Sequence, residues 1–300
     1  MTLTAEFDMD SKRLGKEIKY LRKEKGINQK ELAEGICTQS AISQIESGEI
    51  FPRIDTLYYL AAKLRVSIDF FLSILFHEKH NYINNTKAYI QMLSNKKQYD
   101  ELYFFSKNEL KNNKLHSEYH QFLLWHYFMS SYYLKKINYS QCINELKKLI
   151  TLASIHEKYE LIDLKIMNAI ANLHAENEDY TSSIEIHNKI ISMEDIPEEE
   201  FYKLKIKVLY NKSKTLFKIG DTKLSLKSCE DAYKISTEKE SLFLLGQIFF
   251  QKGQCLEKFT NTDISLIKEC YKNSLIFLEI FKMDYYINII KKEKQQYLCS

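Results

Sequence analysis

The sequence predicts an all-α protein in which a small N-terminal helical domain precedes a long array of helix pairs. The 300 residues include only 7 Gly and 2 Pro, although 45% are hydrophobic and 28% are charged. Sheets and long loops need turn residues, so this composition favours stacked amphipathic helices and excludes intrinsic disorder. In addition, a segment of about 40 residues recurs along the C-terminal part of the chain.

Two segments at the start of the chain predict short helices joined by a turn. Apolar residues at helical spacing, followed by Gly26 as a C-terminal cap, predict a helix over residues 11–25. Asn28 and Glu31 have the spacing of a capping box, which opens a second helix that ends at residue 33.

The third predicted helix, over residues 38–47, has the polar face that reading DNA requires. Thr38 caps its N-terminus and Gly48 closes it, while Ile42 and Ile45 face inward. Amides and hydroxyls on the outer face can pair with base edges in the major groove. The outward-facing candidates are Gln39, Ser40, Ser43 and Gln44. An ordinary solvated face is at least as common for an isolated helix, so the surrounding residues must decide.

The charges around this helix favour a DNA-binding function. Nine basic side chains stand against six acidic ones between Ser11 and Arg53, a modest local charge of +3. All four arginines lie in the first 65 residues, and Arg is suited to phosphate and guanine, although a codon bias towards Lys would give the same skew. Modest basicity suits a homodimer that adds its contacts on a two-fold operator, with Lys30 and Arg53 among them.

The string QKELAEGICTQSAISQIESGEIFPRIDTLYYLAAKL resembles the Cro/repressor-type helix-turn-helix family over about residues 12–75. The matching positions are Gln29, Leu32, Ala33, Ser43, Ile45, Glu46, Gly48, Pro52, Leu57 and Ala61. The resemblance implies a five-helix DNA-binding domain over residues 1–67, with helices four and five at 54–64 and 68–75. The last helix runs on as a connector, which we place at 68–80. The resemblance also implies that Gln29 and Gln39 brace each other near a phosphate.

The remainder of the chain is repetitive. Similar turns occur in NKKQYDEL, LKKINYSQCI, ENEDYTSSI, FKIGDTKLSL and KFTNTDISLI. Their equivalent residues Tyr99, Tyr139, Tyr180, Thr222 and Thr262 are separated by 40, 41, 42 and 40 residues. This period fits two helices with their connections. Such arrays resemble tetratricopeptide repeats, which are usually ~34 residues long and stack into a right-handed α-solenoid. We therefore predict about five degenerate repeats over residues 81–300.

The first helix of each pair faces the concave groove of such a solenoid, which commonly holds an extended peptide. Counting back from the turns gives one residue for each of four repeats, with two further amides one helical turn away: Tyr127, Asn168, Asn211 and Gln251, then Asn172 and Gln247. An amide offers both a donor and an acceptor, so a ladder of amides can bind a peptide main chain. For any single amide, a role between helices is the commoner one.

The order of these parts resembles the peptide-pheromone-responsive transcriptional regulators of Gram-positive bacteria, the Rap/NprR/PlcR/PrgX family. The likeness runs almost end to end, through HQFLLWHYF, YSQCINELKKL, MNAIANLHAEN, LYNKSKTLF and LGQIFFQKGQCL. It implies a dimeric regulator whose binding to DNA is controlled by a short re-imported signalling peptide in quorum sensing. We expect an activator, although the sequence does not distinguish activation from repression. It also implies that Lys97, Asn168, Asn211, Gln247 and Tyr285 form the peptide groove, which we extend by Asn172 and Gln251.

Other features restrict the compartment and the chemistry. The six cysteines form no C-x-x-C pair, the first ten residues lack a signal-peptide pattern, and no apolar run reaches 18 residues. We therefore expect a cytoplasmic protein with no membrane contact. Neither the pair His77 and His80 nor the pair His116 and His120 reads H-E-x-x-H, and phosphate-loop and nucleophile-elbow motifs are absent. These observations predict no catalysis, no metal and no cofactor.

Two other functions stay open at this point. The repeats could hold a protein partner while the helix-turn-helix serves only as a docking module. Alternatively, a regulator could respond to oxidants through Cys37 or Cys299.

Overall fold

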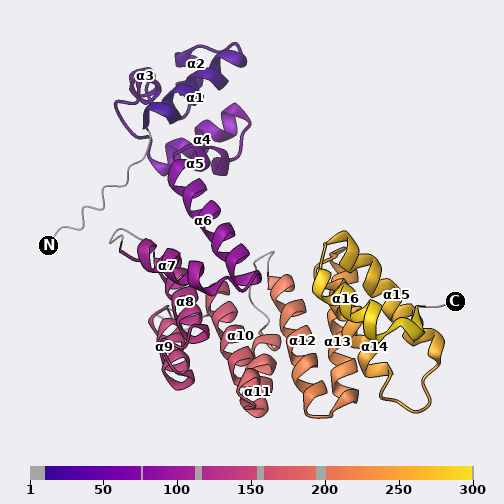
Figure 1. Cartoon of the computed structure of the whole chain (residues 1–300). Helices are drawn as coiled ribbons and strands as arrows, with labels where there is room; N and C mark the ends of the chain where they lie inside the picture. Colours follow the sequence, from indigo (N-terminus) through magenta and orange to yellow (C-terminus); the bar gives the residue numbers. More distant parts are fainter. Residues whose placement is uncertain (1–10, 76, 112–116, 154–158, 194–200, 299–300) are drawn as a thin grey trace. The chain divides into compact units, whose positions relative to one another are not determined.

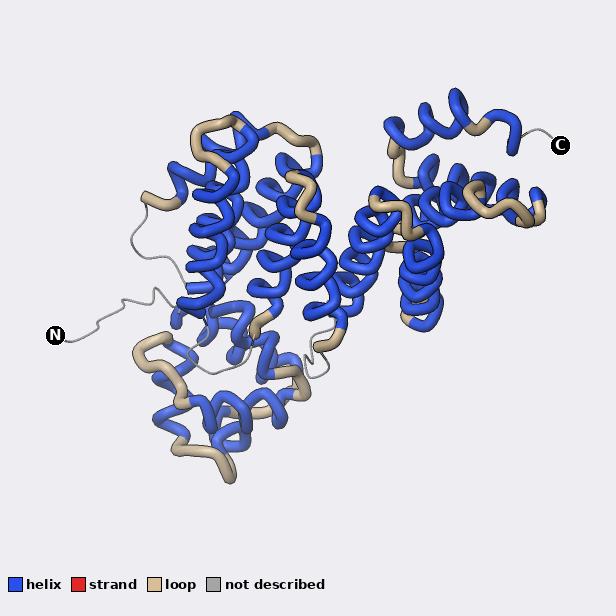
Figure 2. The backbone as a smooth tube through the Cα atoms, turned by 90° about the horizontal axis from the view of Figure 1, so that it is seen from below, coloured by secondary structure: helices blue, strands red, loops and turns tan. Residues whose placement is uncertain are grey.

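The computed structural model describes residues 11–75, 77–111, 117–153, 159–193 and 201–298. Every regular element in these ranges is a helix and none is a strand, which confirms the predicted all-α class (Figures 1 and 2). None of the described helices is both long and apolar enough to span a lipid bilayer. The contacts divide the chain into two compact units, Met1–Lys96 and Lys97–Ser300.

The described residues of the first unit form six helices. They are α1 (Ser11–Glu24), α2 (Gln29–Ala33), α3 (Gln39–Ser47), α4 (Ile54–Leu64), α5 (Ile68–Leu75) and α6 (His77–Asn95). The first five agree with the predicted ranges to within one residue at each end, because their end signals are local. Asn28 accepts from the backbone N–H of Glu31, whose carboxylate accepts in turn from the N–H of Asn28, and Gly48 closes α3 with a left-handed φ of 78°.

The core of the first unit includes the fifth helix. Phe71 and Leu75 of α5 are buried with Leu14, Ile18 and Ile42 in one cluster. Residues 68–75 therefore form part of the folded helix-turn-helix domain, whereas we had placed the start of the connector at residue 68. The difference arises because α5 is apolar enough to pack on α1 and α4.

One glycine sets the distance between α1 and the predicted reading helix. At Gly15 of α1, an added Cβ would overlap the backbone carbonyl of Ile45 and approach that of Glu46 within 3 Å. The backbones of α1 and α3 therefore meet with no side chain between them. This direct backbone approach fixes α3 against the rest of its domain.

The second unit is a series of antiparallel helices. They are α7 (Tyr99–Glu109), α8 (Ser117–Tyr133), α9 (Tyr139–Ala153), α10 (Leu161–Glu176), α11 (Tyr180–Ile191), α12 (Phe201–Lys218), α13 (Thr222–Glu238), α14 (Leu245–Leu256), α15 (Ile264–Ile280) and α16 (Asp284–Glu293), followed by the 3-10 turn η1 (Gln295–Tyr297). Each helix packs on the next, and α8, α10, α12 and α14 also touch one another in that order. We call these four helices the inner helices, because they are the first members of the predicted helix pairs.

The repeated turns have a common geometry. Four of the five equivalent residues named above are the first residues of α7, α9, α11 and α13, and the fifth lies two residues before α15. In three of these turns, the residue two positions before the equivalent residue adopts a left-handed conformation. These residues are Lys97 with φ 56°, Glu178 with φ 64° and Gly220 with φ 86°. Asp179 and Asp221 then cap α11 and α13 with their side chains. The repeat of about 40 residues in the sequence therefore corresponds to the recurrence of this turn between two helices.

Two buried histidines make the second unit sensitive to acid. Burial lowers the pKa of His126 to about 4 and that of His187 to about 3, and both ring nitrogens of His187 lack a hydrogen-bond partner in the described structure. An unfolded histidine titrates near 6.5, so below that pH the unfolded state binds more protons. We expect the contribution of these two histidines to the free energy of unfolding to be constant above pH 6.5. Below it, down to pH 4, the loss is about 1.4 kcal/mol per pH unit for each histidine.

Urea titrations followed by the fluorescence of the single tryptophan, Trp125 of α8, measure this slope. In the variant His187→Leu, the dependence of the free energy of unfolding on pH should be smaller by about 1.4 kcal/mol per pH unit. The variant His120→Gln, which changes an exposed histidine, should leave this dependence unchanged. A parental slope retained in His187→Leu would contradict the assignment.

Candidate DNA-reading helix and ligand groove

The four predicted reading residues lie together on the solvent face of α3. Gln39, Ser40, Ser43 and Gln44 are all exposed, while Ile42 and Ile45 are buried on the opposite face. The hydroxyl of Thr38 accepts from the backbone N–H of Ala41 at 3.1 Å and begins the helix. Lys30 and Arg53 are exposed as well, and Gln29 is half-buried. The helix therefore presents amides and hydroxyls to solvent on a rigid base.

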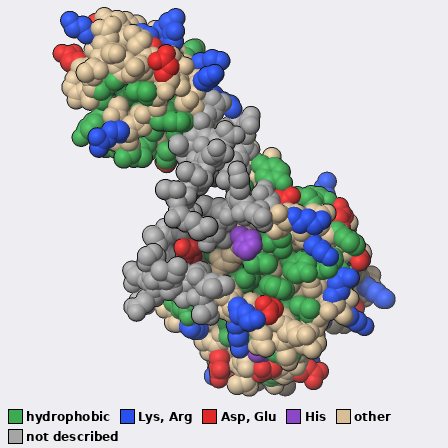
Figure 3. Space-filling view, turned by 90° about the vertical axis from the view of Figure 1, so that its left-hand side faces the viewer, with side chains coloured by type: hydrophobic (Ala, Val, Ile, Leu, Met, Phe, Trp, Pro, Cys, Tyr) green, Lys and Arg blue, Asp and Glu red, His purple; other side chains and the backbone are tan. Residues whose placement is uncertain are grey.

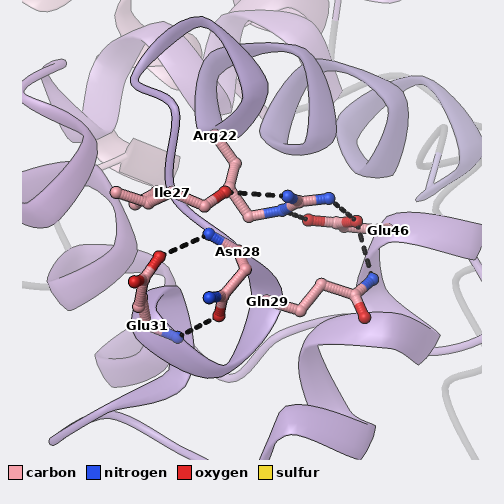
Figure 4. Close-up of polar contacts among 6 residues, drawn as sticks. All are labelled: Arg22, Ile27, Asn28, Gln29, Glu31 and Glu46. Atoms are coloured by element: carbon pink, nitrogen blue, oxygen red, sulfur yellow. Dashed lines mark hydrogen bonds and ion pairs between the residues drawn. The ribbon is translucent and has the colours of Figure 1, made fainter.

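A buried ion pair holds α1, α2 and α3 together (Figure 4). The guanidinium of Arg22 donates to both carboxylate oxygens of Glu46, at 2.5 and 3.0 Å, and to the carbonyl of Ile27 at 2.9 Å. Gln29 donates to the same carboxylate at 2.9 Å. Burial opposes the ionisation of Glu46, but the hydrogen bonds from Arg22 and Gln29 outweigh burial and lower its pKa. The pair is charged, enclosed and shared by three helices.

This arrangement corrects the predicted pairing of Gln29 with Gln39. The amide of Gln29 donates to Glu46 instead, because an ionised carboxylate is a stronger acceptor than an amide oxygen. Gln39 stays exposed at the start of α3. Arg22 and Glu46, which belong to the charges counted between Ser11 and Arg53, are both buried.

The surface of the first unit mixes charges of both signs. On the face drawn in Figure 3, Lys and Arg side chains are spread over this unit together with acidic and hydrophobic side chains. Such a surface agrees with the modest local charge found in the sequence. Cys37 is half-buried, and burial raises the pKa of its thiol, which disfavours the reactive thiolate. Cys299 lies outside the described residues.

In the second unit, the structure brings two predicted amides into direct contact. Asn168 of α10 and Asn211 of α12 are 4% and 7% exposed, and the side-chain amide of Asn211 donates to the side-chain oxygen of Asn168 at 3.2 Å. Asn172 is half-buried one turn further along α10. Of the predicted ladder of amides, these two asparagines are therefore joined by a hydrogen bond between neighbouring inner helices.

The other predicted groove residues are more dispersed. Gln247 and Gln251 of α14 are buried, and their amides donate to the sulfur atoms of Met283 at 3.0 Å and Cys255 at 3.8 Å, not to the asparagines. Lys97 is exposed in the left-handed turn before α7. Tyr285 is 73% exposed at the start of α16.

Lysines that the sequence analysis did not single out share the face of Asn211. Lys207 lies four residues before Asn211 and Lys214 three residues after it, so all three share one side of α12. Both lysines are exposed by surface area. Loss of surrounding solvent nevertheless lowers the pKa of Lys207, and it lowers that of Lys214 to about 8. Both ammonium groups are thus open to solvent on the side of α12 that carries Asn211.

The described part of the chain contains no cluster of three His, Cys, Asp or Glu residues that could hold a metal ion. His116 and the side chains of His77 and His80 lie outside the described residues. The expectation of no metal site therefore stays a prediction.

Two family models match the chain. The RNPP family C-terminal domain matches residues 87–299, and the helix-turn-helix model matches residues 18–71. No curated protein sequence matches.

Solved structures extend the likeness over nearly the whole chain. The structure of Bacillus thuringiensis PlcR in complex with the peptide PapR7 and DNA is 35% identical, covers 96% of this chain and 100% of that one, and gives a TM-score of 0.76. The apo form of the same protein is 32% identical, with coverages of 94% and 99% and a TM-score of 0.65. ComR from S. thermophilus, in complex with DNA and its signalling peptide ComS, shares the fold at 15% identity. Its coverages are 95% and 99%, and its TM-score is 0.63.

Proposed function

The chain belongs to the RNPP family and is a transcription regulator of the quorum-sensing type, and from this premise we propose that it binds both DNA and a short signalling peptide. The observation that carries the proposal is the likeness of the whole chain, helix-turn-helix and repeats together, to a protein whose structure holds a peptide and DNA. The fold and the family match regulators rather than enzymes. We assign no catalytic activity to the chain and place it in the cytoplasm.

The DNA-binding half of the proposal rests on α3. A homodimer presents two copies of this helix to a two-fold operator, with half-site centres about 34–36 Å apart or a multiple of that distance. The residues assigned to DNA are Gln29, Lys30, Gln39, Ser40, Ser43, Gln44 and Arg53. For Gln29 the support is indirect, since its amide is engaged by Glu46 and it acts by positioning α2 against α3.

The peptide-binding half rests on the inner helices of the repeats. The residues assigned to the peptide are Lys97, Asn168, Asn172, Asn211, Gln247, Gln251 and Tyr285. A bound peptide changes DNA binding only if it binds one arrangement of the dimer better than another. Activation of transcription then follows from the arrangement in which both reading helices match the operator.

Selection of DNA fragments tests both halves at once. The purified chain is mixed with a fragmented host genome, with and without the small-peptide fraction of spent culture medium, and the bound fragments are sequenced. We expect palindromic sites whose enrichment changes with the peptide fraction. Enrichment without that change would contradict the peptide half, and no enrichment in either sample would contradict the DNA half.

A variant separates the groove from the reading helix in the same experiment. Asn211→Ala removes the amide that bonds Asn168 and should enrich the same fragments while losing the response to the peptide fraction. The matched control is Asn188→Ala, an exposed asparagine on the outer helix α11, which should behave as the parent. A normal peptide response in Asn211→Ala would remove this groove from the proposal.

A further inference from the structure

The inner helices α10 and α12 each carry a polar stripe at helical spacing. On α10 the stripe is Lys165, Asn168, Asn172 and Glu176, and on α12 it is Lys207, Asn211, Lys214 and Lys218. The hydrogen bond from Asn211 to Asn168 joins the two stripes at their middle. Lys207 therefore lies on one side of the amide pair and Lys214 and Lys218 on the other, on the surface that we assign to the peptide.

Charges of one sign dominate this surface. The positive charges of Lys97 and Lys218 lower the pKa of Lys214. The positive charge of Lys165 lowers the pKa of Lys207 in the same way. Among the described residues, no carboxylate lies within 4.0 Å of the ammonium groups of Lys207 or Lys214. The nitrogen of Lys214 lies 4.8 Å from the centre of the Tyr210 ring.

Glu176 is the one carboxylate that favours the charged form of Lys214. Its oxygens also accept from the hydroxyl of Tyr133, both at 3.1 Å. This surface thus carries several positive charges, with one acid among the groups that act on Lys214. Like charges repel one another. A ligand with negative charge relieves this repulsion, so this surface favours an anionic occupant.

We propose that the groove selects an acidic peptide, whose Asp or Glu side chains lie against Lys207 and Lys214 while Asn168 and Asn211 bond its main chain. This inference rests on the proposed peptide-binding function and adds the charge of the ligand to it. Charge-assisted hydrogen bonds from ammonium to carboxylate supply the selectivity, and they are stronger than bonds between neutral groups. The amide pair favours a peptide over other anions, because it offers main-chain groups both a donor and an acceptor.

Three pools of synthetic seven-residue peptides test the proposal on the purified full-length chain. All pools share the same randomised uncharged positions, and two central positions are Asp or Glu in the first pool, Asn or Gln in the second, and Lys or Arg in the third. Peptides retained with the protein on ultrafiltration are quantified by mass spectrometry. We expect the acidic pool to be retained at least about tenfold more than the amide pool at 50 mM salt, and the difference to shrink at 300 mM salt because of screening.

Matched variants locate the effect. The double variant Lys207→Gln/Lys214→Gln should retain the acidic pool only as well as the amide pool, and its retention of the amide pool should equal that of the parent. The control, Lys223→Gln/Lys239→Gln, changes two exposed lysines at the ends of the outer helix α13 and should keep the preference. Equal retention of the acidic and amide pools by the parent, or a preference for the basic pool, would overturn the inference and leave peptide binding intact. Retention of no pool would overturn the peptide half of the proposed function and this inference with it.

Discussion

Replacing Arg22 with Met should unfold the N-terminal unit while the repeats stay folded. The substitution leaves the Glu46 carboxylate buried with only Gln29 to bond it, and removing one partner of a buried ion pair costs about 3–5 kcal/mol. That is a large share of the ~5–15 kcal/mol that stabilises a typical domain. Hydrogen exchange measured by mass spectrometry resolves the two units, so we expect protection to be lost in α1–α3 and kept in α10 and α12.

Two further variants separate the ion pair from general damage. Arg22→Met/Glu46→Leu removes both charges and should recover most of the lost protection, since an apolar pair of similar size is nearly neutral in stability. Arg53→Met changes an exposed arginine and should shift the free energy of unfolding by less than about 0.5 kcal/mol. If the single and double variants were equally unstable, the buried charge would not be the cause.

Replacing Gln39 and Ser43 together with Ala should abolish operator-specific binding. Each lost base contact costs about 1–3 kcal/mol of discrimination, so the pair weakens one half-site by at least about 30-fold. Fluorescence anisotropy with a fragment from the genomic selection measures this loss. Binding to random DNA of the same length, which depends on phosphate contacts and salt, should stay as in the parent.

The matched control for this variant is Ser73→Ala/Gln91→Ala, which changes one exposed hydroxyl on α5 and one exposed amide on α6. It should bind the operator as the parent does, and both variants should keep the oligomeric state of the parent. Unchanged operator affinity in Gln39→Ala/Ser43→Ala would remove α3 from the DNA-binding proposal.

Local signals in the sequence were sufficient for the helices and for the outer face of α3. Caps such as the capping box of Asn28 and Glu31 depend on residues three apart, and exposed side chains need no partner elsewhere in the chain. The pairing of Arg22 with Glu46 joins residues 24 positions apart, so composition alone could not show it. A signal was present nonetheless, because Glu46 follows Ile42 and Ile45 at the spacing of the buried face.

The groove was predictable in part for the same reason. Counting from the turns placed Asn168 and Asn211 on adjacent inner helices, and they are in contact. The same counting gave no reason to prefer Lys207 or Lys214, because a chain rich in lysine carries them on most helix faces. Their electrostatic surroundings depend on charged residues of other segments, such as Lys97, Lys165 and Glu176, and on no single segment of sequence.

The turns between helices also bear on how heat-resistant this protein could be made. Glu178 and Glu240 have φ values of 64° and 49°, a backbone region in which a side chain with a Cβ is strained and glycine is not. Gly220 already occupies the position of its own turn that corresponds to Glu178. Glycine at these two positions would remove the backbone strain and stabilise the array, and neither position belongs to the amide pair. An engineer could raise its melting temperature there, by Glu178→Gly or Glu240→Gly, without altering the surfaces assigned to DNA or peptide.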